Sequence, residues 1–343
     1  VSFGTVAEQF LYEIGDPRAY ILPDVVCNFT NVTMEELGSD RVLVRGAKGL
    51  PPTDTYKVSA TYLKGYRISI AVIIVGIKAT EKAQVSAEAI IKKTQRIFSE
   101  NGWSNYIDKK ISIIGTEVTY GDNARPTQPR EVLLRIMATH EQREALILLS
   151  REIAQASTGM TPGFTNMLGG RPSVSPSIRL FSFLIPKNNV KITIDINGKQ
   201  LSSDLHNEGG FEVDEISNEP VVFDKAETTD AEVPLVKLAY ARSGDKGDHA
   251  NIGVIARKSE FLPYIRAYLT PERVAAYFAH VVKGKVDRWD LPGIGAFNFL
   301  LRNSLGGGGM ASLNVDPQGK AYAQQLLDII IPVPRKITEE VNK

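Results

Sequence analysis

The sequence predicts an α+β protein with two domains of mixed or antiparallel sheet and helices on one face. Its 343 residues are enough for two domains of ordinary size. Runs rich in β-branched and aromatic residues alternate with segments in which apolar residues recur at helical spacing. From Tyr66 to Pro186 the expected order is β-α-β-β-α-β, which is the order of the split βαβ, ferredoxin-like motif.

The first expected element is a short helix. Thr5-Val6-Ala7-Glu8 has the spacing of a capping box, and Gly15-Asp16-Pro17 ends the helix. Lys64-Gly65 is placed as a hairpin turn between two of the strands that follow. The apolar stripe of the helix is Val6, Phe10, Leu11 and Ile14, and the expected strands are residues 24–33, 41–45, 57–62 and 66–75.

A long helix follows these strands. Thr80 is a good N-cap, and apolar residues recur at helical spacing from Ala83 to Phe98, before Asn101-Gly102. The other elements expected in this part of the chain are strands at 110–117, 131–139 and 178–185 and a helix marked by Leu146, Leu149, Ile153 and Ala156.

Acidic residues crowd between His206 and Val233, where Lys225 is the single base. We therefore expect a larger domain at 1–205, an acidic linker at 206–233 and a small α+β, ferredoxin-like domain at 234–343. The small domain is expected to contain strands at 234–240, 250–256, 296–302, 310–315 and 328–333, a helical stretch that reaches His280 with Thr270-Pro271 inside it, and a helix opened by Asp316-Pro317.

Composition limits the classes of partner. The net charge is +1, from 40 Lys and Arg against 39 Asp and Glu, so no overall field recruits nucleic acid or an anionic membrane. The one cysteine, Cys27, has no partner for an intrachain disulfide, and the longest apolar run is far too short to span a bilayer. We expect a cytoplasmic protein.

Several signatures are missing from the sequence. There is no Walker loop, and Gly293-Ile294-Gly295 lacks the third glycine of a dinucleotide fingerprint. No cysteine or histidine cluster has the spacing of a structural zinc site. His140 and His280 fall at the ends of expected elements and are interpreted as capping or surface residues. No cofactor is therefore assigned from motifs.

The most informative segment runs from Ala241 to Gly253, and we expect it to be a polar loop between two apolar strands. A lysine beside carboxylates can hold an anionic or carbonyl oxygen while a carboxylate or histidine moves a proton. The alternative is a hairpin loop with an internal salt bridge. The candidate catalytic residues are Asp245, Lys246, Asp248 and His249, with Ser243 and Asn251 as candidate substrate contacts.

Two further segments are candidate anion contacts. Four consecutive glycines, Gly306, Gly307, Gly308 and Gly309, expose backbone N–H groups that can cradle a phosphate or carboxylate, although a wide flexible hairpin is an equal alternative. Arg171 lies in a long Gly/Pro-rich loop and offers a bidentate guanidinium. Asp245 and Asp248 are also hard oxygen ligands that suit Mg²⁺, and the sequence leaves that possibility open.

The run Ala241 to Arg257, ARSGDKGDHANIGVIAR, resembles the C-terminal domain of the acyclic terpene utilisation AtuA family. Other segments agree and extend the resemblance over essentially the whole chain. They are Gly4 to Gln9, Tyr12 to Pro17, Tyr20 with Pro23-Asp24, Gly46 to Gly49 with Asp54 to Val58, and Asn298-Phe299 through the glycine run. Because family members carry a further α/β region before the equivalent of Gly4, the resemblance implies that this chain is the C-terminal portion of a longer protein.

The resemblance implies a place in the breakdown of branched acyl-CoA thioesters derived from acyclic terpenes. The first hypothesis is a hydratase- or lyase-type enzyme on a CoA thioester, with Lys246 and the glycine run holding an oxygen. The second is a non-catalytic binding or assembly module that partners an acyl-CoA carboxylase or a related enzyme. The expected partners are a small acyl-CoA, the N-terminal region of the same protein and further copies of the chain, with no nucleic acid and no membrane.

Overall fold

The computed structural model describes residues 1–125, 127–166, 170–202, 209–212, 216 and 226–342. The chain divides into two compact units. Unit 1 consists of Val1–Ala60, Ser182–Ser304 and Gln318–Lys343, and unit 2 consists of Thr61–Phe181 and Leu305–Pro317. Both units combine helices with antiparallel strand pairs, so the predicted α+β class is confirmed.

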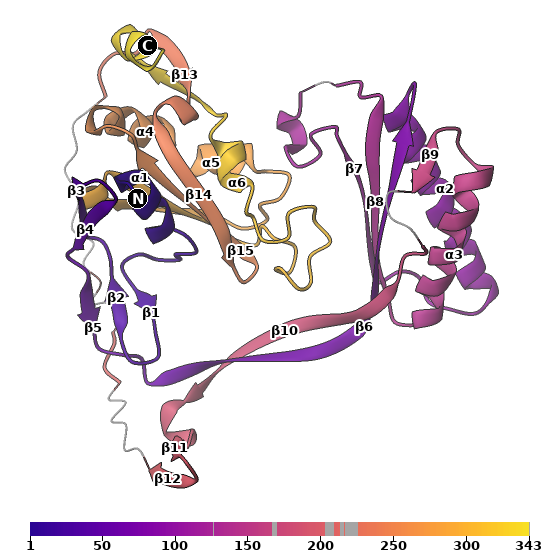
Figure 1. Ribbon diagram of the computed structural model, residues 1–343, viewed down its shortest axis with the longest axis horizontal. Coiled ribbons are helices and arrows are strands. Elements are labelled where there is room, and N and C mark those ends of the chain that lie inside the picture. The colour runs from indigo at the N-terminus through magenta and orange to yellow at the C-terminus, as the bar shows by residue number, and fades with distance from the viewer. Residues whose placement is uncertain (126, 167–169, 203–208, 213–215, 217–225, 343) are drawn as a thin grey trace. The chain divides into compact units, whose positions relative to one another are not determined.

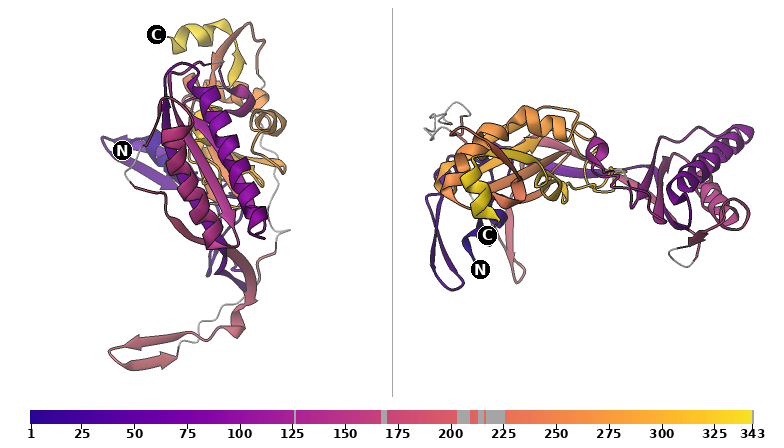
Figure 2. Two further views of the ribbon diagram at one scale, coloured as in Figure 1. Left: turned by 90° about the vertical axis from the view of Figure 1, so that its right-hand side faces the viewer. Right: turned by 90° about the horizontal axis from the view of Figure 1, so that it is seen from above.

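The central sheet of unit 2 has the strand order β10-β6-β8-β7. Two helices, α2 and α3, lie side by side across one face of this sheet (Figure 2, left). The elements are β6 (Thr55–Val75), α2 (Ala79–Glu100), β7 (Asp108–Ile114), β8 (Glu131–His140), α3 (Arg143–Gly159), β9 (Phe164–Asn166), which pairs with β6, and β10 (Val174–Pro186). The first and third long strands are central, so the expected ferredoxin-like order is confirmed.

The two faces of this sheet differ because side chains alternate along each strand. Every second residue of β6 from Ile68 to Ile74 is buried, and these residues pack against the apolar stripes of α2 and α3. His140 is fully buried at the end of β8, where Nδ1 accepts a hydrogen bond from the N–H of Gln142. Gln142 is the residue that precedes α3, so this contact agrees with the capping interpretation, whereas the surface alternative is wrong.

Two local expectations in this region are wrong. Lys64-Gly65 is not a hairpin turn, because β6 runs unbroken from Thr55 to Val75. Gly65 has φ 68°, and a Cβ there would lie 2.5 Å from the carbonyl oxygen of His140, so the glycine allows close approach of β8. Thr80 is not the N-cap of α2, since that position is Lys78 at φ 57° and makes no side-chain cap.

Unit 1 is built on a second antiparallel sheet, with the strand order β14-β15-β17-β16. Along the chain, the helices α4 and α5 come between β15 and β16, and α6 follows β17 (Figure 1). Thr270 caps α5 by accepting from the N–H of Arg273, as its Thr-Pro sequence predicts. The elements are β14 (Ala239–Lys246), β15 (His249–Ala256), α4 (Leu262–Tyr268), α5 (Pro271–Tyr277), β16 (Val286–Leu291), β17 (Ala296–Leu301) and α6 (Tyr322–Leu326).

Smaller elements complete unit 1. The helix α1 (Phe3–Phe10) packs with its buried Ala7 against residues of the β15 and β17 region. One small sheet consists of β1 (Tyr20–Ile21), β2 (Val26–Asn28) and β5 (Lys48–Leu50). The remaining strands pair as β3 (Thr33–Gly38) with β4 (Arg41–Arg45), β11 (Thr193–Ile196) with β12 (Lys199–Ser202), and β13 (Ala231–Pro234) with β18 (Ile330–Val333). The last helix is α7 (Arg335–Val341).

Several sequence-based boundaries in unit 1 are wrong. The capping box of α1 is formed by Ser2 and Thr5, one turn earlier than expected, because Ser2 takes the extended N-cap conformation. The strand expected at 234–240 is divided between β13 and β14. Most of the expected acidic linker, at 206–208, 213–215 and 217–225, lies outside the described residues, and the expected domain bounds remain a prediction.

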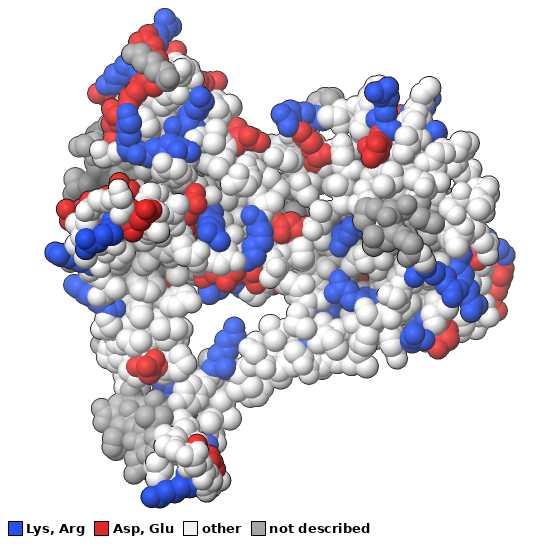
Figure 3. All heavy atoms as spheres, in the orientation of Figure 1, with Lys and Arg blue, Asp and Glu red and all other residues white. Residues whose placement is uncertain are grey.

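The C-terminal expectations also need correction. Residues 310–315 form turns and irregular backbone instead of a strand, and Asp316-Pro317 opens no helix, since α6 begins at Tyr322. Repeated glycines favour turns over a strand. No helix among the described residues is long and apolar enough to cross a membrane. Basic and acidic side chains are interspersed on the face drawn in Figure 3, in keeping with the small net charge.

Candidate functional site

The polar segment 241–253 folds as two paired strands. Lys246 pairs with His249 across a two-residue turn of Gly247 and Asp248, and the ladder continues to Ala239 opposite Ala256. The expected long loop is therefore wrong in extent, and the hairpin alternative describes the backbone correctly. Gly247 has φ 68°, as such a tight turn requires. Polar side chains thus stand at fixed positions on a hairpin.

Two glycines of this hairpin make room for the segment that follows α1. A Cβ on Gly253 would lie 2.5 Å from the Cβ of Leu11, which is fully buried. A Cβ on Gly244 would lie 2.7 Å from the Cγ of Glu13 and 2.8 Å from the ring of Tyr12. Since both contacts are shorter than carbon atoms tolerate, only glycine allows residues 11–13 to rest on β14 and β15.

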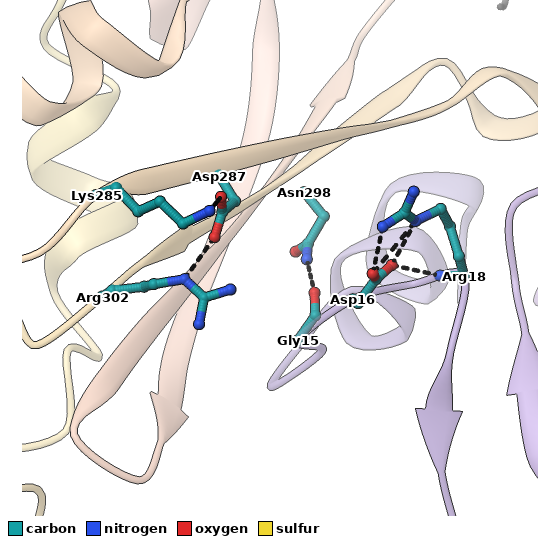
Figure 4. Close-up of polar contacts among 7 residues, drawn as sticks. All are labelled: Gly15, Asp16, Arg18, Lys285, Asp287, Asn298 and Arg302. Carbon is teal, nitrogen blue, oxygen red and sulfur yellow. Dashed lines mark hydrogen bonds and ion pairs between the residues drawn. The ribbon is translucent and has the colours of Figure 1, made fainter. Parts of the chain in front are cut away.

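Two fully buried amide side chains then hold this segment in place. Asn251 of β15 donates to the carbonyl oxygen of Leu11 at 2.8 Å and accepts from the N–H of Glu13 at 2.8 Å. It also donates to Oδ1 of Asn298 on β17. Asn298 in turn donates to the carbonyl oxygen of Gly15 at 2.6 Å (Figure 4). These buried hydrogen bonds fix one conformation of the turn, because leaving any of them unmade is costly.

Glu13 occupies an unusual backbone position within this turn. Its φ is 58°, a left-handed conformation that is unfavourable for a residue with a branched or long side chain. Such strain persists where the surrounding structure enforces it, and it is concentrated at functional sites. Here the bond from Glu13 N–H to Asn251 enforces the conformation, and the carboxylate is left half-buried, with 36% of the side chain exposed.

The carboxylate of Glu13 belongs to a charged cluster. Nζ of Lys320 lies 2.6 Å from Oε1 of Glu13 and 3.3 Å from Oδ1 of Asp245, and it also donates to the hydroxyl of Tyr12. Lys246 places its Nζ 5.1 Å from the centre of the Tyr20 ring. We call Tyr12, Glu13, Asp245, Lys246 and Lys320 the unit 1 charge cluster.

Electrostatics fix the ionisation of this cluster. Burial alone raises the pKa of the Glu13 carboxyl, but hydrogen bonds from Lys320 and Tyr12 and the nearby charges of Lys320 and Lys246 hold it below its usual value. Burial alone lowers the pKa of Lys320, whereas its bonds to Glu13, Tyr12 and Asp245 raise it above the usual lysine value. At neutral pH the cluster therefore contains an ionised carboxylate beside ammonium groups.

The other two candidate catalytic residues, Asp248 and His249, contact the end of β17. Nδ1 of His249 accepts from the backbone N–H of Asn303 at 2.9 Å, which leaves the ring proton on Nε2 in the neutral form. The carboxylate of Asp248 accepts from the Asn303 side chain at 3.3 Å. His249 is thus oriented as a hydrogen-bond donor at Nε2, while Asp248 helps to tie the hairpin to β17.

Comparison with known proteins assigns the family. Residues 1–196 match the family described as acyclic terpene utilisation family protein AtuA, and residues 233–332 match its AtuA ferredoxin-like domain. The chain belongs to the AtuA family. The resemblance drawn from the hairpin is therefore confirmed, whereas these matches give no support to the expectation that this chain is the C-terminal portion of a longer member. No curated protein and no solved structure matches the chain.

The hairpin residues expected to bind substrate serve the fold of the AtuA ferredoxin-like domain. The Ser243 hydroxyl is buried, donates to the carbonyl oxygen of Lys320 and accepts from the N–H of Ala323. Ser243 therefore anchors the segment that carries Lys320, just as Asn251 anchors the segment that carries Glu13. Both position members of the charge cluster, and their direct contact with a substrate remains a prediction.

The candidate anion contacts of this AtuA-family chain belong to unit 2. Arg171 is exposed in the segment before β10. Gly306, Gly307 and Gly308 have φ values of 69°, 97° and 80°, and the carbonyl oxygen of Gly308 accepts from the N–H groups of Ala311 and Ser312. The run from Gly306 to Gly309 thus bends at left-handed φ values and leads into a turn that Gly308 closes, and its role in binding remains a prediction.

Sequence reasoning missed three members of the charge cluster: Tyr12, Glu13 and Lys320. Tyr12 and Glu13 were noted only as part of a family-like segment, and nothing local to Lys320 marks it. Asp245 and Asp248 contact different partners, Lys320 and Asn303. Among the described residues no group of three or more His, Cys, Asp or Glu side chains is placed to hold a metal ion.

Proposed function

We propose that this AtuA-family chain is an enzyme of hydratase or lyase type that acts on a CoA thioester in the use of acyclic terpenes. The observation that carries the proposal is Glu13, a non-glycine residue held at φ 58° by a buried amide. The fold keeps its carboxylate ionised beside two ammonium groups. Strained backbone is concentrated at functional sites, and chemistry at the carboxylate is consistent with this position.

The proposed chemistry uses the charges as they stand. In the elimination direction, the Glu13 carboxylate takes the proton from the carbon next to the thioester carbonyl. The ammonium of Lys246 stabilises the negative oxygen of the resulting enolate. The carbon–carbon double bond then forms as the bond to the β-hydroxyl breaks, and the leaving oxygen departs as water with a proton from the Tyr12–Lys320 pair. That pair recovers its proton from Glu13 through solvent, and hydration is the reverse.

The test is turnover by the full chain with a panel of branched 2-enoyl-CoA and 3-hydroxyacyl-CoA thioesters. Glu13→Gln is expected to lower kcat by about 10²–10⁴-fold, the usual contribution of a positioned base. Lys246→Ala is expected to abolish turnover while the fold is kept. The matched controls are Glu35→Gln and Lys57→Ala, which alter exposed side chains elsewhere in unit 1. Equal rates for Glu13→Gln and Glu35→Gln would refute the role of Glu13.

One observation favours a second candidate, a non-catalytic module that assembles with further copies or with an acyl-CoA carboxylase-type enzyme. Lys320 is compensated by Glu13 and Asp245, and an ion-paired cluster of this kind also suits a subunit contact. On this alternative, Lys246→Ala changes the oligomeric mass measured by light scattering, and no thioester is turned over by any variant. A change in rate at constant mass supports the enzyme.

A further inference from the structure

The face of the unit 2 sheet that α2 and α3 do not cover carries three arginines on three neighbouring strands. Arg67 lies on β6, Arg135 on β8 and Arg179 on β10. Arg67 is opposite Thr139 and Ala71 is opposite Arg135 in the β6–β8 ladder. Because Ile68 and Ile136 point into the core under the helices, the alternation along each strand sends the side chains of Arg67 and Arg135 to the other face.

The glycine-rich segment Leu305–Pro317, which is part of unit 2, contacts this face. Nη1 of Arg67 donates to the carbonyl oxygen of Met310 at 2.8 Å, and Nη1 of Arg135 donates to that of Leu313 at 2.9 Å. A Cβ on Gly307 would lie 3.6 Å from Nη1 of Arg179. Lys110 of β7 adds a fourth cation, with its Nζ 2.5 Å from the side-chain oxygen of Asn314.

The three arginines have no acidic partner in the part of the chain that the structure describes. Among the residues that the structure describes, none of Arg67, Arg135 and Arg179 forms an ion pair, and the acceptors of Arg67 and Arg135 are neutral carbonyl groups. Burial and the charge of Arg179 lower the pKa of Arg67, and burial and the charge of Arg67 lower the pKa of Arg135. Like charges thus act on one another in a half-buried place, which is unfavourable without an anion.

Two buried polar atoms at this place have no hydrogen-bond partner among the described residues. Nε of Arg179 is one, and Oγ of Ser112, a residue that is 1% exposed, is the other. Ser112 stands directly opposite Arg135 in the β7–β8 ladder, so the two side chains share a face. Buried donors of this kind are normally satisfied, and unsatisfied ones next to uncompensated cations indicate a missing acceptor.

Arg288 shows how an arginine with a structural role differs from the three arginines of unit 2. Arg288 in unit 1 is also desolvated and donates to two backbone carbonyl groups, those of Arg266 and Leu269. However, the charges of Asp290 and Glu272 offset part of the lowering of its pKa. Among the described residues, no carboxylate offsets the lowering of the pKa of Arg67 or Arg135 in this way, and the charge that acts on each is that of another arginine. Structural bonding therefore does not account for the arginine face.

We propose that Arg67, Arg135 and Arg179, together with Ser112 and the turns of Gly306–Gly308, bind a phosphate group. Three guanidinium groups exceed what a single carboxylate neutralises, and their forked donors match the several oxygens of a phosphate. The same chemistry has two sources, inorganic phosphate and the phosphate ester of a coenzyme such as CoA. The phosphate site is argued from the arginine face alone, so it does not rest on the reaction proposed above.

The test measures binding without turnover, so its failure is distinct from failure of the proposed reaction. The melting temperature of the full chain is recorded in sodium phosphate and in sodium chloride of equal ionic strength. Phosphate is expected to raise it by about 2 °C or more near saturation. No rise over chloride in the wild-type chain would overturn the proposal, and this result is independent of whether any variant folds.

Calorimetric titration then locates the site and its source. Arg67→Gln and Arg179→Gln are each expected to weaken phosphate binding by at least about tenfold, as loss of a charged hydrogen bond implies. Arg151→Gln, an exposed arginine on α3 of the same unit, is the matched control and leaves binding unchanged. Equal weakening by Arg151→Gln, or none by Arg67→Gln and Arg179→Gln, would contradict the assignment.

The ligands titrated are inorganic phosphate, CoA, dephospho-CoA and pantetheine. Binding of CoA that falls on removal of its 3′-phosphate and disappears with pantetheine supports a coenzyme source. Binding of inorganic phosphate alone supports the same site with free phosphate as its ligand. Equal binding of pantetheine and CoA would contradict a phosphate site, because pantetheine carries no phosphate.

Discussion

Two clusters of charged side chains, one in each unit, differ in how their charges are compensated. In unit 1, Lys320 meets Glu13 and Asp245, and Asp287 lies 2.8 Å from Nζ of Lys285 and 2.6 Å from Nε of Arg302 (Figure 4). In unit 2, the charge of Arg179 acts on Arg67 and that of Arg67 acts on Arg135, while Arg67 and Arg135 donate to neutral carbonyl groups. The lysine of the unit 1 cluster is neutralised by carboxylates of the chain itself, whereas the arginines of unit 2 have no such partner among the described residues and are the groups expected to bind an anion.

The comparison also separates two uses of a polar side chain. The buried Asn251 and Asn298 of unit 1 make a backbone conformation possible, and the ionised groups above them are the ones that can react. In unit 2 the sheet itself presents the arginines, and the glycine-rich segment supplies neutral acceptors. The predictions below test this contrast from the largest expected effect to the smallest.

The largest effect is expected at the amide that holds the turn after α1. Asn251→Ala removes the partners of Leu11 O and Glu13 N in a fully buried place, and each unsatisfied group costs about 1–3 kcal/mol. We expect a loss of about 3 kcal/mol in the free energy of unfolding, measured by urea denaturation. Asn31→Ala, at an exposed residue of the same unit, is the control and costs much less. Similar losses in both variants would break the comparison, because the amide would then not be special.

A second effect concerns the space that Gly253, which has no Cβ, leaves for Leu11 directly after α1. Gly253→Ala places a methyl group 2.5 Å from the Cβ of the buried Leu11, and overpacking of this kind costs about 1–3 kcal/mol. Thermal unfolding measures it. The control is Gly159→Ala, because Gly159 has open space around it and, unlike Gly102, does not have a positive φ. If Gly253→Ala has the same melting temperature as the wild-type chain, glycine at this position is not what allows residues 11–13 to pack on the strands.

The third prediction compares the two clusters directly, and the sign of the change in stability distinguishes them. Lys320→Met leaves Glu13 and Asp245 without their cation and is expected to destabilise by about 0.5–1 kcal/mol, a small value because the side chain is 40% exposed. Arg179→Met relieves repulsion with Arg67 and is expected to leave stability unchanged or to raise it in phosphate-free buffer. The two melting temperatures are measured at low ionic strength. Loss of stability in both variants would contradict the contrast.

The smallest effect is the pH dependence of the Glu13 contact. The folded pKa of Glu13 is lowered, so its stabilisation is fully present above the ordinary value of 4.5 and is lost as the pH falls through the lower folded pKa. The difference in melting temperature between the wild-type chain and Glu13→Gln should therefore be constant from pH 6 to 8 and shrink toward zero in acid below about pH 4. A difference that grows in acid would show that the sign of the shift is wrong.

The sequence predicted the parts of the fold that depend on periodicity. Alternation and helical spacing located β8, α2 and α3 and the ferredoxin-like order of unit 2. It failed where glycine has two uses, since Gly65 permits close packing of strands instead of a turn. At 310–315, directly after the glycine run, the expected strand is replaced by turns and irregular backbone. Local composition does not tell these uses apart, because the neighbour that decides between them is distant in the chain.

The candidate site was predictable only in part. The residues of the hairpin are contiguous, so Asp245, Lys246 and His249 were found from one segment. Glu13 and Lys320 are separated by 307 residues in the sequence. They come together because the segment after α1 and the segment before α6 both pack on the β14–β15 hairpin. The arginines at 67, 135 and 179 were missed for the same reason, since each lies on a different strand and no local pattern links them.

The measurement that tests the central contrast most directly is hydrogen–deuterium exchange of the full chain with and without phosphate, at matched ionic strength. We expect slower exchange in residues 305–314 and in the strand segments around Arg67 and Arg135, with no change in residues 11–18 or 243–249. That pattern would show that the uncompensated cluster of unit 2 receives the anion. Protection at the unit 1 charge cluster, or no protection anywhere, would contradict the account.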